Sequence, residues 1–263
     1  MKISANGRIL KRNHFWFEDD VTDLSKISKK YFRCDELIIH GNKFRLEGKN
    51  ILCSMQESII TDLSKDINDL WINMTKTLRN EINRAGRENV TCKFYKADDI
   101  ISNDQLLNEF ANVYHSMYEE KGMSDCYLGV NELKDYARQG RLLISTATVN
   151  EKNAVFHSYI YGEGNSRFLH SCSEFRIEGN AARSAMGRAN KFLHWNDMIE
   201  LQKMGIENYD WGGISSLDNP NGIDKFKMAF GGSPIFYYNV MITCSLRLKI
   251  WKKLKHYKEM NLK

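Results

Sequence analysis

The sequence predicts a mixed α/β (α+β) fold built around a central mixed β-sheet. Between residues 64 and 118, apolar residues recur at three- and four-residue spacing, which is typical of amphipathic helices. Residues 142–173 are instead rich in β-branched and aromatic residues, which is typical of strands. With 263 residues, the chain is long enough for one large domain or two smaller ones.

The composition is that of an ordinary soluble globular protein, with 42% hydrophobic and 27% charged residues. The net charge of +5 suits an anionic small molecule but is too small to indicate nucleic acid. The six cysteines form no CxxC pair, which argues against a metal site or a disulfide framework. Neither a signal peptide nor a membrane-spanning run is present, so we expect a cytoplasmic protein.

The first third of the chain reads as short strands followed by one helix. The strands are predicted at residues 7–10, 36–40, 43–46 and 58–60, with turn residues between them. A helix with Ser64 as its N-cap then carries one apolar face as far as Ile82. A further strand is predicted at residues 90–95.

From residue 104 the predicted order is helix, short helix, three antiparallel strands, loop, helix, strand, short helix and strand. The three strands cover 142–149, 154–161 and 167–173, and polar residues between them mark hairpin loops. The loop covers 174–190, and the next helix carries apolar residues from Phe192 to Met204. The next strand ends in Tyr209-Asp210-Trp211-Gly212-Gly213.

The last predicted helix, residues 245–263, has two interpretations. One side carries apolar residues and the rest carries lysines: Leu246, Ile250, Trp251, Leu254 and Tyr257 against Lys249, Lys252, Lys253 and Lys255. Such a helix either lies on a membrane surface or packs on its own domain. We favour packing, and we expect no stable membrane insertion.

A phosphate-binding segment is predicted where the third antiparallel strand leads into the next helix. Ser184-Ala185-Met186-Gly187-Arg188-Ala189-Asn190 lies there, with Arg183 just before it. Backbone N–H groups at a helix N-terminus, exposed by small residues and backed by arginines, suit a pyrophosphate.

This segment and the element order resemble the Gcn5-related N-acetyltransferase (GNAT) fold. The Gly187-x-Ala189 part matches the family's loop motif, although Ser184 stands where the motif has Gln or Arg. A closer resemblance is to the FemAB-like branch, carried by residues 59–63, 79–85, 209–213 and 222–231. It implies a GNAT-like fold, with a partial N-terminal copy in residues 1–96 and an acyltransferase domain in residues 97–263.

The branch contains two chemistries, one using acyl-coenzyme A and the other aminoacyl-tRNA. The length and mild charge of the chain favour the first. The resemblance then implies an N-acyltransferase that moves an acetyl or 3-hydroxybutyryl group from acyl-CoA to a nucleotide-linked amino sugar for surface polysaccharide. An aminoacyl-tRNA-dependent transferase and a non-catalytic binding protein are the alternatives. We expect small-molecule partners and a possible homodimer.

An amine must lose a proton before or while it attacks a thioester, so a general base is expected. Alternation along residues 167–174 places Phe168, His170, Cys172 and Glu174 on one face. We rank the candidate bases in the order His170, Asp210, Glu174 and His157.

The remaining candidates are assigned to binding. The predicted coenzyme A ligands are Ser173, Arg183, Ser184, Gly187, Arg188, Ala189, Asn190, Gly212, Gly213, Asn219 and Lys227. The resemblance associates Lys227 with a phosphate, which suits a positive charge. The predicted substrate-binding residues are Tyr118, Lys121, Tyr159, Trp211 and Lys225.

Overall fold

In the computed structural model of the protein, residues 1–6, 10–18, 20–174 and 179–260 are described. The chain divides into two compact units, one formed by Met1–Gln56 with Phe236–Lys263 and the other by Glu57–Ile235. Strands β4 (Ile51–Asp62) and β10 (Ser233–Thr243) have residues in both units. The boundary expected after residue 96 falls inside the larger unit, and the partial N-terminal copy stays a prediction.

The smaller unit is a four-stranded arrangement in the order β1-β2-β3-β10. Its other strands are β1 (Lys2–Asn6), β2 (Lys11–Trp16) and β3 (Glu36–Asn42), and its helices are η1 (Leu24–Lys26), η2 (Lys29–Phe32) and α8 (Leu246–Met260). The predicted strand at 36–40 is confirmed. Residues 43–46 form no strand, and 7–9 of the predicted strand 7–10 lie outside the described residues.

The larger unit contains the strands β4-β9-β8-β7-β6-β5 in that order. Their bounds are β5 (Thr91–Tyr95), β6 (Leu142–Val149), β7 (Lys152–Gly162), β8 (Asn165–Ser173) and β9 (Asn208–Asp210). Strands β6, β7 and β8 pair antiparallel as predicted. Strand β9 pairs parallel to β8, which requires a crossover, and the long helix α6 supplies it.

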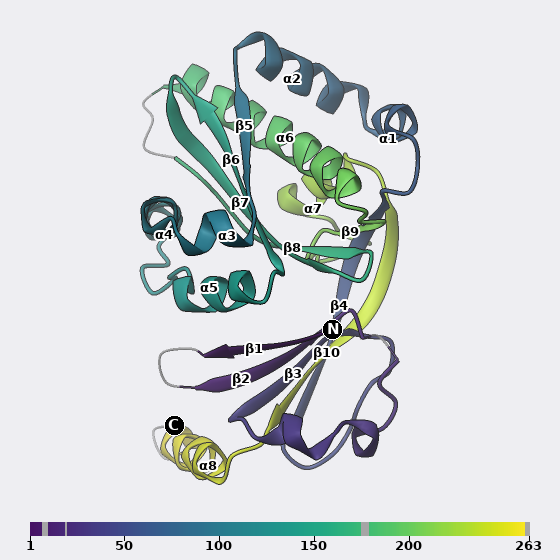
Figure 1. The fold of residues 1–263 in the computed structure, drawn as a ribbon, viewed down its shortest axis with the longest axis vertical. Helices are drawn as coiled ribbons and strands as arrows, with labels where there is room; N and C mark the ends of the chain where they lie inside the picture. The colour runs from purple at the N-terminus through teal and green to yellow at the C-terminus, as the bar shows by residue number, and fades with distance from the viewer. Residues whose placement is uncertain (7–9, 19, 175–178, 261–263) are drawn as a thin grey trace. The chain divides into compact units, whose positions relative to one another are not determined.

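Helices cover both faces of this sheet (Figure 1). They are α1 (Ile67–Asn73), α2 (Lys76–Arg87), α3 (Ala97–Ile101), α4 (Asp104–Glu120), α5 (Val130–Arg138), α6 (Asn180–Lys203) and α7 (Gly222–Met228). Phe110 of α4 stacks on Phe156 on one face, whereas His194 of α6 packs against Phe168 and Trp211 on the other. Within the described residues, no helix has the length and apolar character to cross a membrane.

Two sequence expectations about helix ends are wrong. The helix expected from Ser64 to Ile82 is two helices, because the side chains of Asp66 and Thr75 each cap a new N-terminus. The loop expected at 174–190 is shorter, since α6 already begins at Asn180. Small residues at 180–190 are compatible with a loop, but the alanines among them also favour a helix.

We expect Gly232→Ala to destabilise the larger unit. Gly232 has φ +120°, and an added Cβ would lie 2.7 Å from both the Ile59 side chain and the Ile60 carbonyl oxygen. Gly205 also has a positive φ, +77°, but an added Cβ there would meet open space. Gly205→Ala therefore measures the cost of the positive φ alone, without a steric clash. Urea unfolding should show a loss of about 2–4 kcal/mol for Gly232→Ala and only about 1–2 kcal/mol for Gly205→Ala. Equal losses would contradict the steric argument.

Candidate active site

The pairing of β8 with β9 ends at an ion pair. Arg167 and Asp210 are the last register partners, and both guanidinium atoms Nε and Nη2 lie 2.7 Å from Asp210 Oδ2. The other carboxylate oxygen accepts hydrogen bonds from Ser58 Oγ at 2.6 Å and from the Gly212 amide at 2.9 Å. Asp210 is buried, and its carboxylate holds three segments together: Arg167 comes from β8, Ser58 from β4 and Gly212 from the turn after β9. It is an anchor here, which argues against its predicted role as a base.

The glycine turn that follows is held closely against β8. Gly212 has φ +76°, and an added Cβ would lie 2.4 Å from the Phe168 carbonyl oxygen, so no side chain fits there. Lys227 of α7 donates from Nζ to the carbonyl oxygens of Trp211 at 2.9 Å and Gly213 at 2.5 Å. Burial lowers the pKa of Lys227, while Asp210 and Asp224 oppose the shift. Lys227 thus holds this turn against α7.

A β-bulge in β8 reverses which face its side chains occupy. Ser158 pairs with His170 and Tyr159 pairs with Phe168, so Leu169 is an extra residue. Phe168 packs against His194 of α6, whereas His170 packs edge-on against Tyr114 of α4. The expectation that Phe168 and His170 share a face is therefore wrong, because an extra residue breaks the period of two.

His170 is the candidate base that the geometry favours. Its Nδ1 lies 2.8 Å from the Ser158 hydroxyl, which fixes the ring on the α4 face. Burial lowers the pKa of His170 to about 4, with a small opposing effect from Glu132. The imidazole is therefore neutral at pH 7, and the same burial makes it a weaker base than an exposed histidine. The neighbouring bulge leaves the backbone groups of one residue outside the ladder, where they can serve a developing oxyanion.

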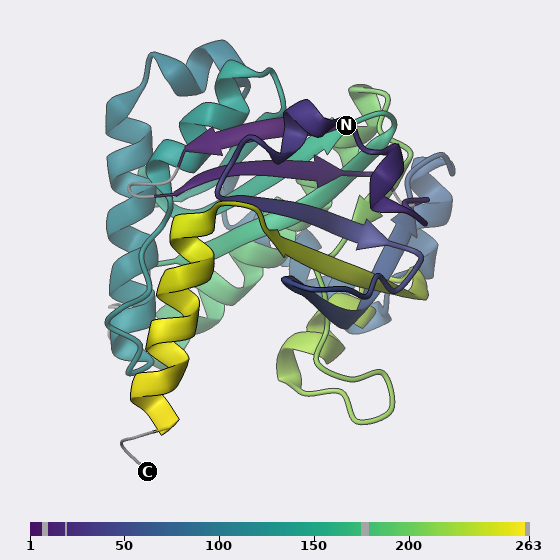
Figure 2. The ribbon, with the colours of Figure 1, turned by 90° about the horizontal axis from the view of Figure 1, so that it is seen from below.

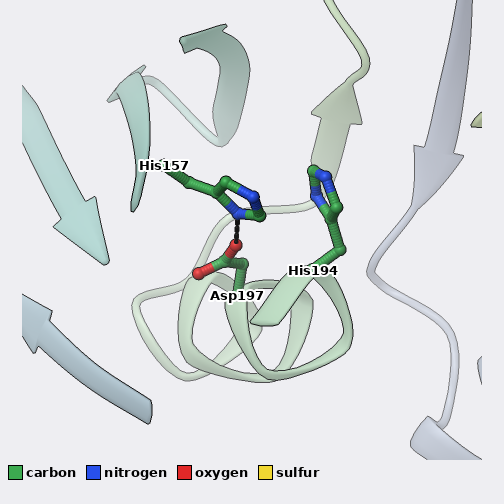
Figure 3. A group of neighbouring side chains, drawn as sticks. All are labelled: His157, His194 and Asp197. Carbon is green, nitrogen blue, oxygen red and sulfur yellow. Dashed lines mark hydrogen bonds and ion pairs between the residues drawn. The ribbon is translucent and has the colours of Figure 1, made fainter. Parts of the chain in front are cut away.

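His157 lies on the opposite face in a closed hydrogen-bond network (Figure 3). Its Nδ1 is 2.7 Å from Asp197 Oδ2, and its Nε2 is 2.7 Å from Asn190 Oδ1. Tyr159 also donates to Asp197, at 2.6 Å, and burial raises the pKa of that phenol, which keeps it protonated. Because His157 is fully buried and both its nitrogens are engaged, it has no free atom for a substrate.

The same network contains three possible metal ligands. One donor atom each from His157, His194 and Asp197 lies within 4.8 Å of the others. His194 Nδ1 is 3.0 Å from the Tyr209 hydroxyl, and burial lowers the pKa of His194, so this ring is neutral. Hydrogen bonds account for the way these side chains converge. The network joins β7, β9 and α6.

A cavity of about 520 Å³ opens between α4, the β6–β7 turn and the end of β8. Val113 and Met117, on either side of Tyr114 along α4, line it together with Phe156. Its charged lining is acidic, with four glutamates against one lysine: Glu109, Glu120, Glu151 and Glu174 against Lys152. The cavity therefore suits a cationic group better than an anionic one.

Glu174 is occupied within this lining. It forms an ion pair with Lys152, and its own backbone amide is bonded to Ala154. Ser173, predicted to contact coenzyme A, lines the same cavity. Glu174 therefore lines the cavity with its carboxylate paired to Lys152. It is a weaker candidate for the general base than His170.

The predicted pyrophosphate segment lies along α6. Arg183 and Ser184 are exposed in its first turns, and the Ser184 hydroxyl donates to the Asn180 carbonyl oxygen at 2.8 Å. Arg188 instead forms a two-pronged ion pair with Glu88 of α2, at 2.8 and 2.9 Å. Since free N–H groups occur only in the first turn of a helix, Arg183 is placed for an anion and Arg188 is not.

The other predicted binding residues are distributed over the larger unit. Gly187 and Ala189 lie inside α6, Ala189 being buried. Tyr159 and Trp211 are fully buried, which leaves no surface for a substrate. The exposed ones are Asn219 and Lys225 beside α7 and Lys121, whose ammonium lies 5.3 Å from the centre of the Tyr118 ring.

Sequence reasoning missed Arg167, Ser158 and Tyr114. Arg167 directly precedes the predicted strand residue Phe168, but its pairing with Asp210 depends on the parallel register. Ser158 and Tyr114 are ordinary strand and helix residues in the sequence. Only the antiparallel register and helix packing bring them to His170.

Comparison with known proteins shows the fold. No family profile and no curated protein matches the sequence. Among solved structures, FemX has a TM-score of 0.56 at 12% identity, covering 77% of this chain and 65% of its own. The C-terminal domain of a putative lysylphosphatidylglycerol synthetase from Agrobacterium fabrum has a TM-score of 0.54 at 12% identity. The match covers 78% of this chain and 67% of that domain. L-PGS from Bacillus licheniformis has a TM-score of 0.51 at 15% identity, covering 81% of this chain and 70% of its own.

These similarities confirm the mixed α/β, GNAT-like fold expected from the sequence. The chain spans about two thirds of the length of these structures. At such low identity, the likeness extends to the fold and not to a substrate.

We expect His170 to titrate near pH 4 in the folded protein. Its pKa is lowered from 6.5 to about 4, so the folded state resists protonation between these values while the unfolded state accepts it. The stability contributed by the neutral ring is therefore complete above pH 6.5 and is lost as pH falls towards 4. The histidine NMR resonance that disappears in His170→Gln should report the titration. Urea unfolding at pH 7 and at pH 4.5 should show that the free energy of unfolding falls less in His170→Gln than in the wild type. A midpoint near 6.5 would contradict the assignment.

Proposed function

We propose that the protein is an N-acyltransferase that moves an acyl group from acyl-CoA to an amine. The observation that carries this proposal is His170, which is neutral at pH 7 and fixed by Ser158 beside the β8 bulge. The protonated acceptor first loses one proton to water, and His170 takes a second proton as the amine nitrogen adds to the acyl carbonyl carbon. The carbon–sulfur bond then breaks, an amide forms, and the coenzyme A sulfur leaves as a thiolate.

The acidic cavity supports an amine as acceptor. A protonated amine is attracted by its four glutamates, and His170 lies on β8, the strand whose last residue, Ser173, lines the cavity. We propose a nucleotide-linked amino sugar whose amine enters the cavity. Its phosphates would be repelled there, so they are placed outside, where the exposed Lys121, at the end of α4, is a candidate to contact them.

The first turn of α6 is the proposed site for the pyrophosphate of the donor. Gly179, with φ +94°, precedes it, and Arg183 is exposed one turn further on. The helix has 24 residues, so its N-terminus carries the full partial positive charge of a helix dipole.

A second candidate function uses an aminoacyl ester as donor, carried by tRNA. Fold similarity to FemX and to a lysylphosphatidylglycerol synthetase, a name that denotes an aminoacylated lipid, favours it. His170 and the acidic cavity would serve an aminoacyl donor equally well. A non-catalytic binding protein is the third candidate, and it requires neither a titrating base nor turnover.

Calorimetric titration with free coenzyme A separates the donors. We expect micromolar binding by the wild type and a loss of about tenfold in Arg183→Glu, because one charge-assisted contact is replaced by repulsion. Lys203→Glu is the matched control, since it makes the same charge change at the far, exposed end of α6. No binding by the wild type would exclude the coenzyme A proposal. The next titration would then use aminoacyl-tRNA, with uncharged tRNA for comparison.

The base is tested by turnover with acetyl-CoA and a panel of nucleotide-linked amino sugars. We expect His170→Gln to lower kcat by about 10²–10⁴-fold with a smaller change in KM. Ser158→Ala, which removes the ring's hydrogen bond, should show a smaller fall in kcat. An unchanged kcat in His170→Gln would remove His170 from the mechanism, and absence of turnover with every donor would favour the binding protein.

A further inference from the structure

Helix α8 is fastened to the smaller unit through Leu248, Lys252 and Arg247. Leu248 is buried, Lys252 donates to Glu36 at 3.0 Å and to Thr243 at 2.9 Å, and Arg247 forms an ion pair with Asp35 at 2.6 Å. Figure 2 shows α8, in yellow, continuing from β10 and extending past the strands of its own unit. These contacts fix the orientation of the helix, and helical spacing places Leu246, Ile250 and Leu254 on the side away from Leu248 and Lys252, with the exposed Arg247 and Trp251 at the edge of that side.

The outward side is apolar. Leu246, Ile250, Trp251 and Leu254 are 71%, 50%, 56% and 59% exposed, although their spacing places them on one helical face. We expected this face to pack on its own domain, and for these four side chains that expectation is wrong. Large side chains of this kind are exposed together mainly where a surface has a partner.

An apolar hollow adjoins this face. It has a volume of about 450 Å³ and is lined by Leu10, Arg247, Leu248 and Trp251. Its walls are almost entirely carbon, apart from the guanidinium of Arg247. A hollow of this size and character accepts hydrocarbon.

Lysines border the apolar face. Lys253 is exposed, and Lys249 is half-buried beside the exposed Leu246 and Ile250. Long lysine side chains beside an apolar stripe can reach lipid phosphates while the stripe enters the acyl boundary. A second copy of this chain is a poorer partner, because a two-fold axis through the face would bring the same lysines together.

We propose that this face of α8 docks on the surface of an anionic lipid bilayer. The helix lies in the plane of the surface, with Leu246, Ile250, Trp251 and Leu254 in the acyl boundary and Lys249 and Lys253 on phosphates. Its 15 residues are too few to span a membrane, so the contact is peripheral and reversible. This proposal does not depend on the proposed function, because it involves neither the α4–β8 cavity nor α6.

The test is co-sedimentation of the full chain with vesicles. We expect binding to vesicles of 30% phosphatidylserine or 30% phosphatidylglycerol in phosphatidylcholine, to about the same extent because charge is recognised. Binding to pure phosphatidylcholine should be about tenfold weaker, and added salt should weaken the anionic binding. Ile250→Ser/Trp251→Ser and Lys249→Glu/Lys253→Glu should each lower it by about tenfold or more.

Matched controls use surface residues elsewhere. Ile72→Ser changes an aliphatic side chain that is 64% exposed on α1, and Lys203→Glu repeats the charge change on α6. Both should bind like the wild type, and far-UV circular dichroism should show all variants folded. Absence of vesicle binding by the wild type would overturn the proposal. So would a dimer in sedimentation velocity that Ile250→Ser/Trp251→Ser abolishes without any lipid binding, since a second copy would then cover the face.

Discussion

The arrangement of the candidate site depends on the ion pair between Arg167 and Asp210. A carboxylate buried at the last paired position of β9 must be compensated, and it receives an arginine, a serine hydroxyl and a backbone amide. These partners come from β8, from β4 and from the turn after β9. The pair therefore fixes where β8 and β9 stop pairing, and with it where the bulge and His170 lie.

Because of the bulge at Leu169, Phe168 and His170 of β8 lie on opposite faces of the sheet. On the α6 face, Phe168 packs over a network in which a fully buried Asp197 is held by His157 and Tyr159. On the α4 face, His170 is neutral and packs edge-on against Tyr114. Both histidines lie on neighbouring strands of one sheet, yet His157 stabilises the packing of α6 and His170 faces α4. Strand alternation decides the difference, because Ser158, the register partner of His170, is the residue next to His157 along β7.

The charges of the larger unit are separated in a way that suits two unlike substrates. The cavity beside α4 is lined by glutamates, whereas the first turns of α6 present backbone N–H groups and Arg183. The cavity reaches the C-terminal end of β8, and α6 follows that same end in the chain, so the two opposite potentials are compatible with the proposed cationic amine and anionic donor. Arg188, by contrast, compensates Glu88 and ties α6 to α2, so a basic residue in the segment is not evidence of anion binding by itself.

The sequence alone determined the fold class, because hydrophobic period and turn residues are local: the β6–β8 meander, α4, α5 and the β9 turn lie where the pattern predicts them. It also singled out His170 and the buried Asp210. Local pattern could not reveal the Leu169 bulge, the Arg167–Asp210 register or the Arg188–Glu88 pair, since each depends on residues 43 to 100 positions apart or on strand pairing. Tertiary structure therefore decided which candidate groups are free to react, because burial and hydrogen-bond partners are properties of the packed chain and not of the residue type.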